Sequence, residues 1–242
     1  MPPDSYLLML DEVPLVLASV PKVDGSLVNP TSTILAAIES FIRRYLSHFV
    51  TYDSVMDLLG KEEDDSAKRV IVTIAEHPAL FSRLVRLFKA LIEENVPIVP
   101  LPALCRAFLD DFAEQGTLDS LLQVCRMLPE IRPQLPGIAT GTLIGVHADV
   151  ESKIVAGLRP CGDEHLLLLE PEPTQKILSA FRVTIGDLKT EEKPPTVAVV
   201  ESALARRYVR KLTELEFPDL IVLAKGELSP DKREMEKTVS FE

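Results

Sequence analysis

The stretch that most constrains the fold is residues 194–228, in which two short apolar runs flank a helix. The first run covers residues 196–200 and the second covers residues 220–223. Apolar residues recur at helical spacing between the two runs: Leu204, Tyr208, Leu212 and Leu215. Strands joined through a helix usually pair in parallel, with a right-handed crossover. The stretch therefore predicts a strand–helix–strand unit.

The same alternation of strands and helices extends over residues 137–242. Upstream of the opening unit we expect a strand, a helix, a short apolar run and a second helix, at residues 142–146, 149–158, 166–169 and 171–181. Val239 and Phe241 are suited to an edge strand. This order predicts a small α/β domain with mainly parallel pairing.

Residues 29–132 show the period of helices instead. Asn29 and Pro30 are typical of a helix start, as N-cap and first helical residue. A buried stripe is expected on this first helix: Ile34, Ile38, Ile42, Tyr45 and Phe49. Further helical patterns with short loops follow up to residue 128, as in a compact helical domain. The boundary to the next domain is expected at the punctuating residues Pro129, Pro133, Pro136 and Gly137.

Residues 1–28 contain apolar runs at residues 6–10 and 13–20, split by Asp11 and Glu12, which predict a strand pair or hairpin. The expected fold is therefore mixed, of the α+β type. A short β-rich segment (1–28) precedes a helical subdomain (29–132) and a small α/β subdomain (137–242).

Composition argues against several functional classes. A net charge of -11 disfavours general affinity for phosphate backbones, and 5% aromatic residues without Trp disfavour a stacking platform for nucleic acid. No apolar run is long enough to span a bilayer, and the N-terminus lacks the features of a secretory signal. Cys105, Cys125 and Cys161 are too few for a disulfide framework, and we expect reduced thiols in a cytosolic compartment.

Residues 161–165 bring a thiol, two carboxylates and an imidazole together. A structural zinc site needs about four ligands, usually as two spaced pairs, and the sequence offers no second pair. A solvated loop is the favoured interpretation, with no metal. Gly137, Gly141 and Gly145 do not form a phosphate-binding motif, so they are expected to serve turns and close strand packing. No nucleophile elbow or zinc-protease motif occurs.

Four basic residues form the strongest local charge feature, on the helix of the opening unit: Arg206, Arg207, Arg210 and Lys211. Their spacing predicts a cationic outer surface opposite the apolar stripe. Two interpretations stay open. The cations serve solubility and the helix dipole, or they dock an acidic protein surface. Asp110 and Asp111 are adjacent on a helix, about 100° apart, so they are expected on a solvated face and not in a catalytic dyad.

Four segments resemble one family, the cytoplasmic domains of type III secretion and flagellar export-gate proteins (FlhA/InvA/SctV). The first is residues 28–48, with Pro30, Ile42, Arg43 and Arg44 at matching positions. The second is the helix, Asn-Val-Pro-Ile turn and helix of residues 84–109. The third contains the run HLLLLEPE at residues 165–172, whose form favours an injectisome over a flagellum. The fourth is the opening unit, which matches from the Pro194–Pro195 pair to Leu228.

The resemblance implies a ring-forming, non-enzymatic part of a bacterial export apparatus, without cofactor, metal or catalytic residues. It implies a nonameric ring on the cytoplasmic face of the inner membrane. The implied partners are the stalk protein of the export ATPase, a gatekeeper, and chaperone–substrate complexes, with no nucleic acid. The family's membrane helices and second subdomain have no counterpart in these 242 residues, so contact with the membrane is expected only through a missing N-terminal region. Much of the family's chaperone-docking surface lies on those missing parts.

Two sets of residues are the expected contacts. We expect Arg43, Arg44 and the Asp110–Asp111 region to contact neighbouring subunits. We expect the four basic residues to contact partners: Arg206, Arg207, Arg210 and Lys211. The alternative is an α/β regulatory or small-molecule-binding domain, whose ligand would lie at the carboxyl ends of the strands.

Overall fold

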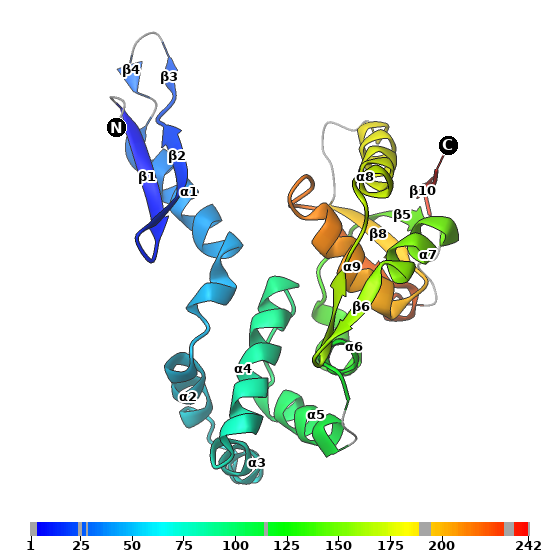
Figure 1. The fold of residues 1–242 in the computed structure, drawn as a ribbon. Coiled ribbons are helices and arrows are strands. Elements are labelled where there is room, and N and C mark those ends of the chain that lie inside the picture. Colours follow the sequence, from blue (N-terminus) through cyan, green and yellow to red (C-terminus); the bar gives the residue numbers. More distant parts are fainter. Residues whose placement is uncertain are drawn as a thin grey trace.

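The fold is given by a computed structural model, which describes residues 4–23, 26–27, 29–113, 116–188, 195–229 and 235–241. Pro194, with which the fourth matching segment begins, lies outside these ranges. The chain forms an open arch, with the N-terminal strands in one limb, helices at the base and the α/β part in the other limb (Figure 1). The predicted mixed fold is confirmed.

The N-terminal limb begins with the predicted hairpin. Strands β1 (Ser5–Leu10) and β2 (Val13–Ser19) pair antiparallel, and β3 (Lys22–Val23) pairs with β4 (Ser26–Leu27). The turn between β1 and β2 is tight, because Asp11 and Glu12 both have positive φ. Acidic residues tolerate this left-handed conformation better than bulky ones.

Helix α1 (Pro30–Arg44) follows, and the short 3₁₀ helix η1 (Leu46–Phe49) extends it. Asn29 caps α1 as predicted, because its side chain accepts from the N–H of Ser32 at 3.3 Å. The predicted buried stripe is wrong: Phe41 is the buried side chain of α1, whereas Ile42 and Phe49 are 44% and 48% exposed. No residue of α1 joins the hydrophobic clusters of the described residues, because few elements pack against this limb.

Helices α2 to α6 form the base of the arch. Their bounds are Tyr52–Gly60, Asp65–Ala75, Pro78–Glu93, Leu101–Ala113 and Leu118–Met127. Polar side chains at Thr51, Asp64 and Thr117 accept from backbone N–H groups and cap α2, α3 and α6.

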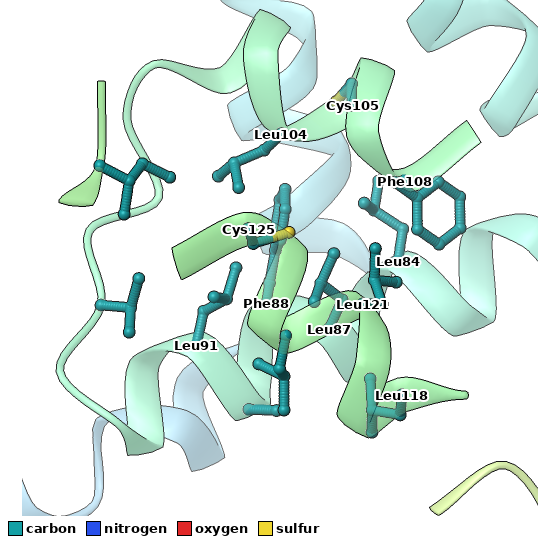
Figure 2. Close-up of a cluster of buried hydrophobic side chains, with 14 of the residues drawn as sticks. Leu84, Leu87, Phe88, Leu91, Leu104, Cys105, Phe108, Leu118, Leu121 and Cys125 are labelled. Carbon is teal, nitrogen blue, oxygen red and sulfur yellow. The ribbon is translucent and has the colours of Figure 1, made fainter. Parts of the chain in front are cut away.

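The core of the base lies between α4, α5 and α6 (Figure 2). Leu84, Leu87, Leu104 and Leu121 are fully buried there. Cys105 and Cys125 belong to the same core, and burial raises the pKa of both thiols to about 12. These cysteines therefore act as small apolar side chains, and both are free thiols, as predicted.

The second limb is an α/β layer whose main sheet, within the described residues, has the strand order β10–β5–β8–β9. The bounds, in that order, are Lys237–Val239, Thr142–Val146, Thr196–Val200 and Ile221–Ala224. All three pairings are parallel, as the alternation of strands and helices predicts. Three helices pack around the sheet: α7 (Ala148–Ala156), α8 (Pro171–Gly186) and α9 (Ala203–Thr213).

A further antiparallel hairpin lies between α7 and α8. Its strands are β6 (Leu158–Cys161) and β7 (Glu164–Leu167). The predicted helix at residues 149–158 therefore ends early. Gly157 allows the turn, because a Cβ there would lie 2.7 Å from the side chain of Leu169.

The base and the α/β layer share one core. Leu143, Val197, Val199 and Leu223 of the sheet belong to the same buried cluster as the helical residues. The connection runs through the 3₁₀ helix η2 (Arg132–Gln134) and Gly137, which has a φ of 76°. A Cβ on Gly137 would lie 2.5 Å from the side chain of Val197, so this glycine serves a turn and close packing, as predicted.

Candidate protein-interaction site

The basic residues of α9 do not form the predicted cationic outer surface. Arg206 is 2% exposed and Arg207 is 6% exposed. Ser202 caps α9 by accepting from the N–H of Ala205, and this start turns both arginines toward the helical base. The prediction of exposure is wrong for these two residues, because acidic side chains from distant elements cover them.

The first group of such acids surrounds Arg206. Its guanidinium donates to Glu94, at the end of α4, at 2.7 Å. Arg126 of α6 donates to Glu94 at 3.3 Å and, through two nitrogens, to Glu227 at 2.6 and 3.0 Å. Glu227 lies in the 3₁₀ helix η3 (Lys225–Glu227) and is fully buried. Acidic side chains at the end of α4 and on η3 thus alternate with arginines on α6 and α9, and the four elements are joined there.

A second group surrounds Arg207. Its guanidinium donates to Asp119 of α6 at 2.5 Å and to Glu164 of β7 at 3.2 Å. Asp119 also lies 2.8 Å from the ring of His165 and 3.0 Å from the hydroxyl of Tyr208. The favoured interpretation of residues 161–165 as a solvated loop is therefore wrong, because this hairpin docks on the base.

We call the two groups together the charged joint: Glu94, Asp119, Arg126, Glu164, Arg206, Arg207 and Glu227. Burial alone would raise the pKa of Glu94, but Arg206 and Arg126 outweigh that effect and hold its pKa below the ordinary value of 4.5. Burial alone would also raise the pKa of Asp119. Hydrogen bonds from His165 and Arg207 outweigh that effect, so the pKa of Asp119 is lowered overall. Both carboxylates are therefore ionised at neutral pH.

The other two basic residues of α9 lie outside the joint. Arg210 donates to the backbone carbonyls of Leu220 at 2.7 Å and Pro218 at 3.0 Å, so it fastens the segment before β9. Lys211 is exposed, with its ammonium 5.6 Å from the centre of the Tyr208 ring. Of the four predicted docking residues, Lys211 alone presents its side chain freely to solvent.

The carboxyl edge of the parallel sheet is where the alternative function would place a ligand. Backbone N–H groups at the start of a helix bind anions readily at such an edge. Here the carboxylate of Glu151, from α7, accepts from the N–H groups of Glu201 and Ser202 at 2.8 and 3.0 Å. Glu151 is 6% exposed. An internal carboxylate thus already binds two backbone N–H groups of the turn that leads from β8 into α9.

The four predicted subunit contacts fall on two separate surfaces. Arg43 and Arg44 are exposed on α1, where Arg43 pairs with Glu39 at 2.8 Å. Asp110 is exposed on α5. Asp111 is only 9% exposed and accepts from Arg83 at 3.1 Å, so its predicted solvated position is wrong. Arg83 supplies a partner from α4 that the sequence pattern does not reveal.

A hollow of about 460 Å³ lies where α5 meets α6 and the chain after it. Ala103, Ala107 and Val124 form its apolar wall, while Arg106, Asp110 and Glu130 supply charge. A second feature that the sequence analysis misses is the exposed apolar surface of the N-terminal limb. Leu35 is 60% exposed and Leu17 is also 60% exposed. The spacing of Leu35 and Ile42 by seven residues is the signal for the part on α1.

Among the described residues, no helix combines the length and apolar character needed to cross a membrane. Within the same residues, no three His, Cys, Asp or Glu side chains are grouped to hold a metal ion.

Solved structures with the same fold include the following two. The Chlamydia pneumoniae CdsV and CdsO protein complex matches with a TM-score of 0.72 at 20% identity, over 98% of this chain and 80% of that chain. The nonameric EscV cytosolic domain from the type III secretion system matches with a TM-score of 0.66 at 20% identity, over 89% and 63%. At these identities the likeness shows the fold.

Sequence comparison gives a closer relationship over part of the chain. Low calcium response locus protein D of Yersinia pestis is 43% identical over 81 residues, which is 34% of this chain and 11% of the relative. The match thus covers a small part of that relative's length. The family model of FHIPEP proteins matches residues 18–233, from β2 to beyond η3. The resemblance seen in the four sequence segments is confirmed, and the chain belongs to the FHIPEP family.

Proposed function

We propose that this chain is the cytoplasmic part of an export gate in a bacterial type III secretion system. It works as a non-enzymatic platform at the cytoplasmic face of the inner membrane. Copies of it form a ring, and the ring docks the proteins that are exported or that regulate export. The observation that carries the proposal is the family match over residues 18–233, together with the fold shared with the nonameric EscV domain.

The charged joint supports the platform role. A docking surface made from two units needs a fixed angle between them. The joint and the shared core tie the α/β layer to the helical base at several points far apart in sequence. Buried ion pairs add little net stability, and we propose that here they favour one arrangement over others, although Glu94 Oε1 and Arg206 Nε are buried without a hydrogen-bond partner. The α/β layer is therefore held in one orientation on the base.

Protein partners are proposed by analogy with a relative. CdsV forms a complex with CdsO, so we propose that this chain docks an equivalent protein. An export-ATPase stalk protein, a gatekeeper and chaperone–substrate complexes are the candidate classes. Nucleic acid is a poor candidate, because Arg206 and Arg207 are neutralised within the chain and the net charge is -11.

The alternative function, a small-molecule-binding domain, is disfavoured because a side chain of the protein already occupies the edge of the sheet where the ligand was expected. Glu151 places its carboxylate against the N–H groups of Glu201 and Ser202, at the start of α9. A phosphate-bearing ligand would have to displace this side chain against charge repulsion. We therefore favour the export platform.

The test is deletion of the gene in the bacterium that carries it, followed by analysis of proteins in the culture medium. We expect the proteins secreted without a cleaved signal peptide to disappear and to return when the gene is supplied in trans. A periplasmic protein with a cleaved signal is the control and is expected to stay unchanged. An unchanged set of secreted proteins in the deletion strain would contradict the proposal.

A further inference from the structure

A continuous apolar surface runs along one side of α1 and η1. We call it the α1 stripe: Leu35, Glu39, Ile42, Leu46 and Phe49. The four apolar members are 42–60% exposed. Their spacing of three, four or seven residues places them on one side of a helix, over a length of roughly 20 Å. Arg43 and Arg44 lie beside the stripe, at the C-terminal end of α1.

An apolar strip of this length is unusual on a surface that has no partner. The N-terminal limb itself does not cover it, since Leu35 and Leu46 stay 60% and 42% exposed beside the hairpin. The arch in Figure 1 sets α1 on one side of α4 and sets α5 and α6 on the other. A surface on α1 therefore cannot reach the hollow at α5 and α6 within one copy of the chain.

The hollow between α5 and α6 complements the α1 stripe in shape and charge. Its wall of Ala103, Ala107 and Val124 offers an apolar recess, because the two alanines leave room for larger side chains. Asp110 and Glu130 at the hollow are exposed acids that suit Arg43 and Arg44. Arg106, also at the hollow, suits Glu39 of the stripe. The stripe and the hollow therefore carry opposite charges at two positions: the arginine pair faces acids of the hollow, and Glu39 faces Arg106.

We propose that the α1 stripe of one copy docks in the α5–α6 hollow of a second copy. The inference rests on the proposed ring and deepens it by naming the two mating surfaces. Because these surfaces differ, the contact is heterologous: each copy keeps one free stripe and one free hollow after pairing. Repetition of such a contact closes into a ring when the rotation permits.

The test uses two matched apolar substitutions, Ile42→Asp in the stripe and Val124→Asp in the hollow. Both side chains are 44% exposed, so both variants are expected to fold. In analytical ultracentrifugation of the full chain, we expect each variant alone to raise the dissociation constant for self-association at least about ten-fold, because a carboxylate buried in an apolar contact is costly. Val72→Asp, at a 51% exposed position on α3, is the control and is expected to assemble like the wild type.

A mixture of the two variants gives the sharpest outcome. Each variant retains the surface that the other has lost, so an equimolar mixture can form one intact contact. We expect a complex of one copy of each variant, with no larger species. A mixture that stays monomeric, or variants that assemble like the wild type, would overturn the proposal.

Charge reversal tests the same contact independently. Arg43→Glu with Arg44→Glu is expected to weaken self-association about ten-fold, and adding Asp110→Lys with Glu130→Lys is expected to restore it. Lys68→Glu with Arg69→Glu, on the exposed side of α3, is the matched control. If the wild-type chain stays monomeric at every concentration, the proposed contact is wrong. The proposed function is tested separately, by the secreted proteins of the deletion strain.

Discussion

Two pairs of adjacent arginines, Arg43–Arg44 and Arg206–Arg207, look alike in sequence and differ in burial and in the origin of their acidic partners. Both pairs lie on helices with an apolar side. The pair on α1 is exposed, and the side chain of Arg43 is 77% exposed even while it pairs with Glu39. The pair on α9 is buried among carboxylates from α4, α6, β7 and η3. A local pattern of charge therefore does not decide whether a cation faces water or protein.

The difference lies in where the acidic partners come from. Glu39 is four residues from Arg43, whereas Asp119 and Glu94 are 88 and 112 residues from the arginines that they bind. Nearby partners can pair in any helix and contribute little. Residues this far apart in sequence come into contact only when the whole fold forms. Their ion pairs therefore depend on the packing of the α/β layer on the base.

The largest expected effect comes from breaking the charged joint with Glu227→Gln. The substitution leaves Arg126 buried without its bidentate partner, and loss of one member of a buried pair costs about 3–5 kcal/mol in the free energy of unfolding. Urea unfolding followed by circular dichroism measures it. Glu214→Gln, at an exposed position after α9, is the control and should change stability by less than about 0.5 kcal/mol. Equal values for both variants would mean that the joint is not formed.

A pair of leucine truncations compares the base with the N-terminal limb. Leu84→Ala opens a cavity in the fully buried core and should cost about 2–5 kcal/mol. Leu35→Ala, at a 60% exposed position, should change the stability of the monomer by less than about 0.5 kcal/mol. The same unfolding experiment at low protein concentration checks both. A large loss for Leu35→Ala would show that the α1 stripe is covered within one copy.

The joint should also make stability depend on acid pH. Glu94 and Asp119 have pKa values lowered in the folded chain, so their stabilisation is complete above the ordinary carboxylate values and is lost as pH falls through the folded values. Below about pH 4, each carboxylate should reduce stability by up to about 1.4 kcal/mol per pH unit. Unfolding curves between pH 7 and pH 2.5 test this. Glu94→Gln should flatten the profile, and an unaltered slope in that variant would contradict the assignment.

The smallest effect on the monomer is expected from Arg43→Ala with Arg44→Ala. Exposed ion pairs on a helix contribute about 0.3–0.5 kcal/mol, so the double variant should stay within about 0.5 kcal/mol of the wild type. Thermal unfolding at low concentration measures it. A loss near that of Glu227→Gln would remove the contrast between the two arginine pairs.

The elements with strong local periodicity could be predicted from the sequence. The strands Thr142–Val146 and Thr196–Val200 and the cap at Asn29 all occur as expected, because each depends on neighbouring residues. The parallel pairing of the sheet follows from the alternation of strands and helices, because a helix between two strands returns the chain to the edge of the sheet where the first strand began.

The charged joint could not be predicted in this way. Glu94, Asp119 and Glu227 appear in the sequence as isolated surface acids, and their pairing depends on how the α/β layer packs on the base. The exposure of Ile42 and Phe49 was missed for the opposite reason. Their period is that of a buried stripe, but few elements of this chain pack against α1. Periodicity predicts that a surface will be covered, and it does not say by which molecule.

The carboxylate of Glu151 near the start of α9 affects whether the stability of the α/β layer depends on metabolite concentrations in the cell. In sheets whose helix ends bind nucleotides, stability rises and falls with the concentration of the ligand. Here the anion is part of the chain, so its effective concentration is fixed by the fold. The stabilisation of this helix end should therefore be the same in starved and in growing bacteria.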